Sequence, residues 1–129
     1  MKNFIYTLVD YIKELEIVSP VRVGIFDDGE SLVVIPVEGS EVIHEYMDGT
    51  LDIRLPFEIH IKSKNQENAF NVLSEVMNHM RNIGEFLDEK DQNHALLGVA
   101  IDQIPFFETS TEDGYFYYKS KVTIDLMMN

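Results

Sequence analysis

The chain of 129 residues contains no cysteine. This absence excludes disulfides, thiolate chemistry, and zinc or iron–sulfur sites with cysteine ligands. Long apolar runs are also missing, and no window approaches the roughly 20 apolar residues that a membrane-spanning helix needs. The first residues form an amphipathic pattern, and the charged segment Asp10–Glu14 is unlike a signal peptide. We therefore expect a protein made in the cytoplasm, with no membrane contact.

Basic residues are scarce as well. Ten lysines and arginines face 23 aspartates and glutamates, which gives a formal net charge of −13. Binding of nucleic acid depends on cations that neutralise phosphates, so this charge argues against a nucleic-acid ligand. An acid excess keeps a protein soluble, and it also suits a surface along which DNA must slide without sticking. Composition alone does not choose between these two uses.

The sequence also lacks the local motifs of common active sites. It has no P-loop, no Gly-x-Gly-x-x-Gly, no Gly-x-Ser-x-Gly and no His-Glu-x-x-His. Its four histidines fall in different predicted elements, and the nearest candidate metal pair is Glu75 with His79 on one helix. A zinc site takes at least three protein ligands, so this pair is not enough. We predict no catalytic, cofactor-binding or metal-binding residues, no cofactor and no enzymatic activity.

Hydrophobic periodicity predicts a single α+β domain over residues 1–129. The polar segment 85–93 is predicted to be a loop, with Gly84 as the stop of the second helix. We expect a mostly antiparallel sheet of about six strands with two main helices packed on one face, in the order α-β-β-β-β-α-β-β. The predicted helices cover 3–15 and about 66–83, and the predicted strands cover 21–26, 31–37, 42–47, 51–62, 95–104 with a continuation at 106–109, and 115–126.

The organising feature is the alternating strand Leu51–Lys62, which runs directly into the second helix. An Asp48-Gly49 turn joins it to the preceding strand in a hairpin. Proline lacks an amide donor, so Pro36 and Pro56 indicate sheet edges or a kink. The alternation predicts one buried face and one face that is wet or covered by a partner. The buried set is Leu51, Ile53, Leu55, Phe57, Ile59 and Ile61, and the opposite set is Asp52, Arg54, Pro56, Glu58, His60 and Lys62.

Aromatic residues gather near the end of the chain, at Phe106-Phe107 and Tyr115–Tyr118. Both faces of the last strand carry aromatics near its start, and one of these faces cannot be core. Tyrosine and phenylalanine are enriched at interfaces, but cross-strand packing explains the pattern equally well. With Lys119 and Lys121 as the nearby cations, base stacking on nucleic acid is disfavoured. The candidate interface residues are Asp52, Arg54, Glu58, His60, Tyr115 and Tyr117.

The segment Phe57–Gln66, followed by Ala69, Phe70 and Leu73, resembles the central signature of tail terminator and minor capsid proteins of tailed bacteriophages. In that family an extended strand ends in a short polar cap and passes into a helix with an alanine near its second turn. The early helix and strands have counterparts there, as does the closing Asp-Gly hairpin. The resemblance therefore covers most of the chain.

The resemblance implies a structural virion assembly protein with no catalytic residues and no cofactor. Similar proteins are α+β folds that assemble into rings, commonly hexamers, which cap the tail tube and meet the head. The implied partners are further copies of this chain, the tail tube and head-completion proteins. The implied location is the host cytoplasm during assembly and then the head–tail junction of a phage or prophage virion. A ring also gives the acid excess a use, because a lumen that DNA crosses should not bind it.

Two other interpretations stay open. One is a small acidic ligand-binding or regulatory α+β domain without catalytic activity, for which a deep, closed pocket would be the sign. The other is an enzyme with an unmarked carboxylate site, and no convergent polar constellation in the sequence supports it. The hairpin over 42–62 favours assembly, because it is longer than the ~5–6 residues of an ordinary strand require.

Overall fold

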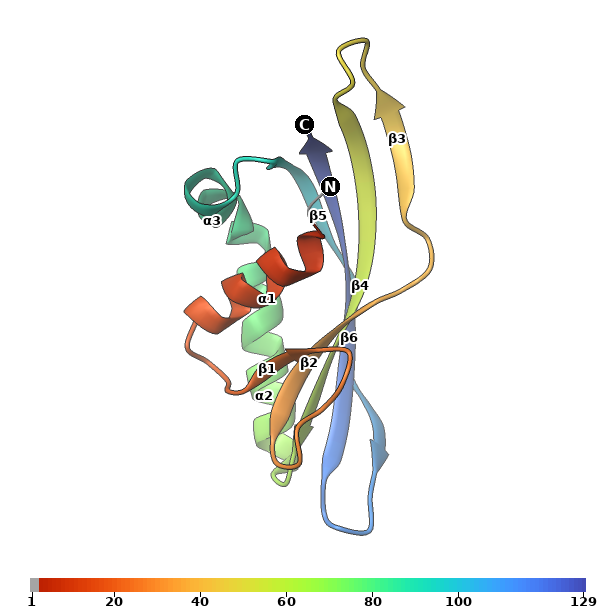
Figure 1. Cartoon of the computed structure of the whole chain (residues 1–129). Coiled ribbons are helices and arrows are strands. Elements are labelled where there is room, and N and C mark those ends of the chain that lie inside the picture. Colours follow the sequence, from red (N-terminus) through yellow and green to blue (C-terminus); the bar gives the residue numbers. More distant parts are fainter. Residues whose placement is uncertain (1–2) are drawn as a thin grey trace.

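The computed structural model describes residues 3–129 and shows one twisted sheet with the helices gathered on one of its faces (Figure 1). The helices are α1 (Phe4–Glu14), α2 (Gln66–His79) and α3 (Ile83–Lys90), with a short 3-10 turn, η1 (Met80–Asn82), before α3. The strands are β1 (Val21–Val23), β2 (Ser31–Pro36), β3 (Glu41–Glu45), β4 (Leu51–Ser63), β5 (His94–Ser110) and β6 (Phe116–Met128). The predicted α+β class and order of elements are confirmed, with one helix added.

Strand β4 organises the sheet, as the sequence predicts. The strands lie in the order β1-β2-β4-β6-β5, and β3 pairs with the first part of β4. The described pairings are antiparallel apart from the parallel pairing of β1 with β2. All of β4 pairs with β6, from Leu51 with Met128 to Ser63 with Phe116. The β3–β4 and β5–β6 hairpins consequently project at opposite ends of the molecule (Figure 1).

The hydrophobic core lies between the helices and the inner face of the sheet. The odd-numbered apolar residues of β4 point into it: four are buried, and Leu51 and Leu55 pack against its margin. The apolar stripe of α2 covers the same face, with Leu73 fully buried. Phe70 is the exception in this predicted stripe, since its ring remains partly exposed beside Tyr118. The four buried apolar residues at these odd-numbered positions are Ile53, Phe57, Ile59 and Ile61.

Asparagine side chains begin both long helices. The Asn3 side-chain oxygen accepts the backbone N–H of Ile5 at 3.1 Å, which satisfies one of the free amides at the start of α1. Before α2, Ser63 and Asn65 are both of residue types that can cap a helix. The structure uses Asn65, whose side-chain oxygen accepts the backbone N–H of Asn68 at 2.9 Å. The Asn65 cap fixes where the chain leaves β4 and turns into the helix layer.

The predicted loop over 85–93 is wrong, because most of it forms α3. Ile83 and Leu87 stand four residues apart and are both fully buried, so their shared side holds the helix on the sheet. Gly84 does not end the preceding helix but lies inside α3. A Cβ atom at Gly84 would stand 3.3 Å from the Leu96 side chain, so glycine allows α3 to approach β5 closely.

Pro56 does not mark an edge, although the sequence suggests one. It lies in β4, which has β6 on one side and β2 and β3 on the other. The Pro56 carbonyl accepts the backbone N–H of Val37, just past the end of β2, so the proline nitrogen faces the gap between β2 and β3. No ladder bond is lost there, which explains why a central strand tolerates proline. Pro36 is the last residue of β2, one residue before the predicted end of this strand, and β2 lies between β1 and β4 rather than at an edge.

Two strands differ clearly from the prediction, and the others differ at their ends by one or two residues. The first strand ends at Val23 rather than at 26, and residues 24–30 form a loop before β2. Strand β5 continues through Pro105 as a single element, with shifts of register between Gln103 and Phe106 and at three other points. Bulges let an edge strand absorb a proline and still follow its neighbour.

Candidate assembly surface

The outer face of the sheet, turned away from the helices, carries most of the predicted interface residues. Asp52, Arg54, Glu58 and His60 share it because they occupy alternate positions of β4, and each pairs with an odd-numbered residue of β6. Tyr117 lies on the same face, opposite Lys62. The structure therefore places these five residues on one face, and contact of this face with a partner stays a prediction.

One end of this face is already covered by the chain itself. The β1–β2 loop folds across it: the Lys62 ammonium donates to the backbone carbonyls of Asp27 and Asp28, at 3.0 and 3.2 Å. The Phe26 ring packs edge-on against Tyr117, with ring centroids 5.4 Å apart. Tyr117 and Lys62 therefore make contacts within their own subunit. Sequence alternation cannot reveal such cover, because the loop is remote along the chain.

The end of the face near the β3–β4 hairpin is held by ion pairs. The Arg54 guanidinium donates to both carboxylate oxygens of Asp125 on β6, at 2.9 and 3.2 Å. It also donates to Glu41 on β3 at 3.2 Å. These bonds raise the pKa of Arg54 above its ordinary value, with the Asp125 hydrogen bonds as the largest cause. Arg54 thus joins three strands at the base of the hairpin.

His60 occupies the middle of the outer face between two carboxylates. Its Nε2 lies 2.9 Å from Glu58, and its Nδ1 lies 3.2 Å from Glu108 on β5. Because a neutral imidazole donates from one nitrogen only, both carboxylates can accept at once only from a ring that holds both protons. The His60 side chain is mostly buried. It therefore connects β4 to β5 and presents little surface to a partner.

Among the predicted interface residues, Asp52 and Tyr115 lie at opposite ends of the sheet. The Tyr46 hydroxyl donates to one oxygen of Asp52 at 2.8 Å, and this hydrogen bond raises the pKa of Tyr46. The other oxygen of Asp52 is buried and has no hydrogen-bond partner within residues 3–129. Tyr115 lies just before β6, with the ammoniums of Lys62 and Lys64 over its ring at 4.5 and 5.2 Å. The structure therefore does not bring Tyr115 near Asp52 or Arg54.

Two exposed apolar patches lie outside the predicted set of interface residues, although the sequence drew attention to the 42–62 hairpin and to Phe106-Phe107. We name the first the arm patch: it lies on β3 and the β3–β4 turn and consists of Val42, Ile43, Tyr46 and Met47. We name the second the edge patch: it lies on β5 and consists of Ile104, Phe106 and Phe107. Adjacent apolar residues in a strand, as in Val42-Ile43, place apolar groups on both faces of a hairpin, and this signal could have found the first patch. Exposed apolar clusters of this kind mark interaction sites.

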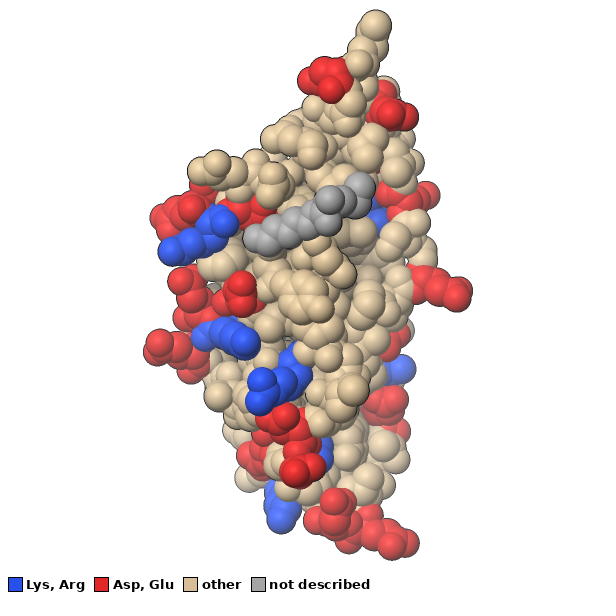
Figure 2. All heavy atoms as spheres, viewed as in Figure 1, with Lys and Arg blue, Asp and Glu red and all other residues tan. Residues whose placement is uncertain are grey.

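Charged residues are distributed unevenly over the molecule. Acidic side chains line both margins and the lower end of the view in Figure 2, with a few lysines and arginines among them. The sequence contains no lysine or arginine between Arg22 and Arg54, a stretch that includes the whole arm patch. The β3–β4 hairpin is therefore strongly acidic.

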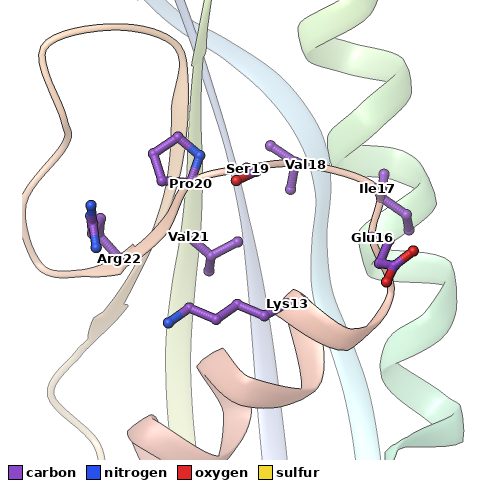
Figure 3. Close-up of a pocket in the computed structure, with 8 residues that line it drawn as sticks. All are labelled: Lys13, Glu16, Ile17, Val18, Ser19, Pro20, Val21 and Arg22. Atoms are coloured by element: carbon purple, nitrogen blue, oxygen red, sulfur yellow. The ribbon is translucent and has the colours of Figure 1, made fainter.

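A groove runs along the segment between α1 and β1 and is open to solvent (Figure 3). Its volume is about 550 Å³. Lys13 and Arg22 lie toward one side of it, and Glu16 lies toward the other (Figure 3). It is not the deep, closed pocket that would favour a ligand-binding domain. Within residues 3–129, no three histidine or acidic side chains gather into a possible metal site.

A buried polar cluster joins α1 to the start of β5. The Asp91 carboxylate accepts from Nδ1 of His94 at 2.8 Å, from the Thr7 hydroxyl at 3.3 Å and from the backbone N–H of Asn93 at 2.9 Å. Burial by itself would raise the pKa of Asp91, but these hydrogen bonds outweigh it and hold the pKa below the ordinary value. Every group in the cluster has a partner, so its role is structural.

These features define an α+β protein whose prominent surfaces are a polar sheet face and two exposed apolar patches, which is the type of surface used in assembly. A model of the bacteriophage tail terminator protein family matches residues 8–127, and the chain belongs to that family. It is a structural protein of phage assembly. The resemblance seen in Phe57–Gln66 is confirmed.

The fold has a counterpart among solved structures. A chain in the virion of a native gene transfer agent particle superposes with a TM-score of 0.57 at 9% sequence identity. The match covers 95% of this chain and 91% of that chain. No curated protein sequence matches the chain significantly. No described helix is both long enough and apolar enough to cross a membrane.

Proposed function

We propose that the chain forms a closed ring, a homo-hexamer, at the head-proximal end of a phage tail, where it caps the tail tube and receives the head. The observation that carries this proposal is the β3–β4 hairpin. All five residues of β3 are exposed, so this strand adds nothing to the core of its own subunit. A hairpin that projects from the domain and exposes apolar side chains is suited to contact a neighbouring subunit.

The position of the exposed surfaces supports a ring. In a closed ring each subunit uses two different patches, because the contacts run head-to-tail. The arm patch and the edge patch lie on different strands, and the two hairpins project at opposite ends of the sheet (Figure 1). Such separation suits a subunit that contacts one neighbour on each side.

The charge supports passage of DNA through the ring. With a net charge of −13 on each subunit, the assembly repels phosphates rather than binding them. We propose that acidic side chains line the lumen, so that DNA crosses it without sticking. A neutral or basic lumen, with the acids spread evenly over the outside, would contradict this part of the proposal.

The proposed role needs no chemistry from the protein. The partners are further copies of the chain, the tail tube below and the head-completion proteins above, and the affinity comes from buried surface and complementary charge. The protein would be made in the host cytoplasm and then remain at the head–tail junction of the virion. Genes for head and tail proteins beside this one would support the assignment.

The test is to disrupt the gene in its phage or prophage and to examine the particles by electron microscopy. We expect separate heads and tails, with tails of irregular length, because nothing caps the growing tube. Supplying the intact protein should restore capped tails of uniform length that join heads. Normal virions in the absence of the gene product would contradict the proposal.

A further inference from the structure

We propose that His60 is a proton-dependent latch. With a proton on both ring nitrogens it holds the part of β5 beyond Pro105 against the rest of the sheet, and it releases that segment when one proton leaves. The latch belongs to a single subunit, so it operates with or without the ring proposed above. Three features carry it: the placement of two carboxylates around the ring, the burial of the ring, and the weak attachment of the segment that it holds.

The His60 ring connects two strands that are not neighbours. Strand β6 lies between β4 and β5, and the Cα partners run from His60 to Lys119 and from Lys119 to Phe106. Nε2 of the ring lies 2.9 Å from Glu58 on its own strand, whereas Nδ1 lies 3.2 Å from Glu108 on β5. The Glu108 contact therefore reaches over β6. Because the two carboxylates meet different ring nitrogens, the three side chains do not converge on a point where a metal ion would bind.

Burial makes the second proton decisive. The His60 side chain is 11% exposed, against 28% for Glu58 and 37% for Glu108. A ring nitrogen without its proton presents a lone pair to a carboxylate, and at this position little water can replace the lost contact. Glu58 keeps the remaining N–H, because it makes the shorter contact, a hydrogen bond within a central strand. Glu108, on the edge strand, is the carboxylate that turns out to solvent.

The other groups that surround the ring have partners of their own. On β2 the residue opposite His60 is Val33, which is uncharged and fully buried. The Lys62 ammonium is held by carbonyls of the β1–β2 loop, and the Lys119 ammonium lies 5.5 Å from the centroid of the Phe106 ring. Within residues 3–129, the carboxylates within 4.0 Å of the ring nitrogens are the two of the latch. The further titratable or charged side chains around this part of the outer face are Tyr117 and Lys121 on β6, Asp102 on β5, and Asp27 and Asp28 in the β1–β2 loop, with Arg22 paired to Asp27.

The segment that the latch holds is weakly attached to the sheet. Residues 106–110 are exposed, and β5 is an edge strand beside β6. The register shifts between Gln103 and Phe106 and again between Phe107 and Thr109, so Glu108 lies in an irregular part of the ladder. Segments with few buried contacts and interrupted pairing open locally at a low cost in free energy. One side-chain link therefore changes the opening of this segment measurably.

Nuclear magnetic resonance and hydrogen exchange on the full chain test the latch. The nitrogen chemical shifts of the His60 ring, assigned by their loss in His60→Gln, report its protonation state at each pH. We expect both ring nitrogens to carry protons at the acid end and one of them to lose its proton as the pH rises. Amide exchange in residues 106–110, corrected for the intrinsic effect of pH, should become severalfold faster above the midpoint of the ring titration, with exchange in β2 unchanged.

Glu108→Gln tests whether the carboxylate is the released partner. A neutral amide can accept from a ring N–H or donate to a bare ring nitrogen, so it keeps the contact in both states of the ring. Exchange in residues 106–110 should therefore no longer follow the ring titration in this variant. Glu112→Gln, in the exposed turn after β5, is the matched control and should keep the wild-type dependence.

Three results would overturn the latch. The first is a His60 ring that keeps one protonation state over the whole pH range in which the protein is folded. The second is exchange in residues 106–110 that does not follow the ring titration, and the third is a Glu108→Gln variant that behaves like wild type. None of these results bears on the proposed ring, which the particles lacking the gene product test separately.

Discussion

Arg54 on β4 and Asp125 on β6 form a two-pronged ion pair, with N–O distances of 2.9 and 3.2 Å. The same guanidinium reaches Glu41 on β3, so one side chain fastens the base of the projecting hairpin to the centre of the sheet. This relationship connects the rigid domain to the part of the chain that we assign to subunit contact.

Replacement of Arg54 by methionine should loosen the hairpin without unfolding the domain. Methionine keeps much of the side-chain length but cannot donate to Asp125 or Glu41. We expect amide hydrogen exchange in β3 to become severalfold faster, with exchange in β2 unchanged. The matched control is Arg22→Met, which removes an ion pair to Asp27 far from the hairpin. Equal exchange in β3 for both variants would show that Arg54 does not organise the arm.

The Asp91–His94 cluster should make stability depend on pH in the acid range. The folded-state pKa of Asp91 is lowered, so its stabilising effect is complete above the unfolded value of about 3.8 and disappears as the pH falls through the folded pKa. Asp91→Asn should therefore reduce the free energy of unfolding by about 1–3 kcal/mol at pH 6. Denaturant melts at several pH values would check this.

The same melts provide the control for that prediction. Asp88 lies three residues earlier on α3 and is exposed, so Asp88→Asn should change little at any pH. The difference between wild type and Asp91→Asn should shrink below about pH 4 as Asp91 takes up its proton. A difference that persists unchanged at pH 3 would contradict the assignment of this cluster.

Neighbouring residues of β4 should respond very differently to substitution. Ile59 is fully buried on the inner face, so Ile59→Ala should cost about 2–5 kcal/mol through lost contacts and a cavity. Glu58 is on the outer face and only partly buried, so Glu58→Gln should cost far less. Thermal melts of both variants would measure the two losses of stability. Similar losses would mean that the two faces of the strand have been assigned incorrectly.

Gly84 should resist enlargement because of its place in α3. A leucine side chain there would collide with Leu96 on β5, and we expect Gly84→Leu to destabilise the domain by about 1–3 kcal/mol. Gly29 serves as the matched control, because a Cβ atom there would meet no other atom within 4 Å. If Gly29→Leu destabilised the domain as much, close packing at Gly84 would not be the cause.

The sequence was most informative where local pattern and tertiary structure agree. The alternation of Leu51–Lys62 predicted the buried face, and the glycine turns predicted both hairpins. The prediction from the sequence failed at α3, because the acidic residues of 85–93 and Gly84 suggested a loop. The buried pair Ile83 and Leu87, four residues apart, carried the helical signal, but its meaning depends on contact with the distant β5.

The surface was harder to predict for the same reason. The alternation of side chains along β4 placed Asp52, Arg54, Glu58 and His60 on one face. It could not show that the β1–β2 loop covers the end of that face near Tyr117. That cover joins segments far apart in the chain, as in the contact between Phe26 and Tyr117. Exposure of the arm patch had one signal in the sequence, the adjacent apolar residues Val42 and Ile43, although alternating strands normally bury one face.

The most direct test of the central claim is the mass of the protein bound at the end of purified tails, measured by native mass spectrometry or by scanning transmission electron microscopy. The subunit mass is 14.9 kDa. We predict a single closed assembly with the mass of a hexamer at one end of each tail, and none along its length. Monomers scattered along the tail, or no binding at either end, would contradict the account.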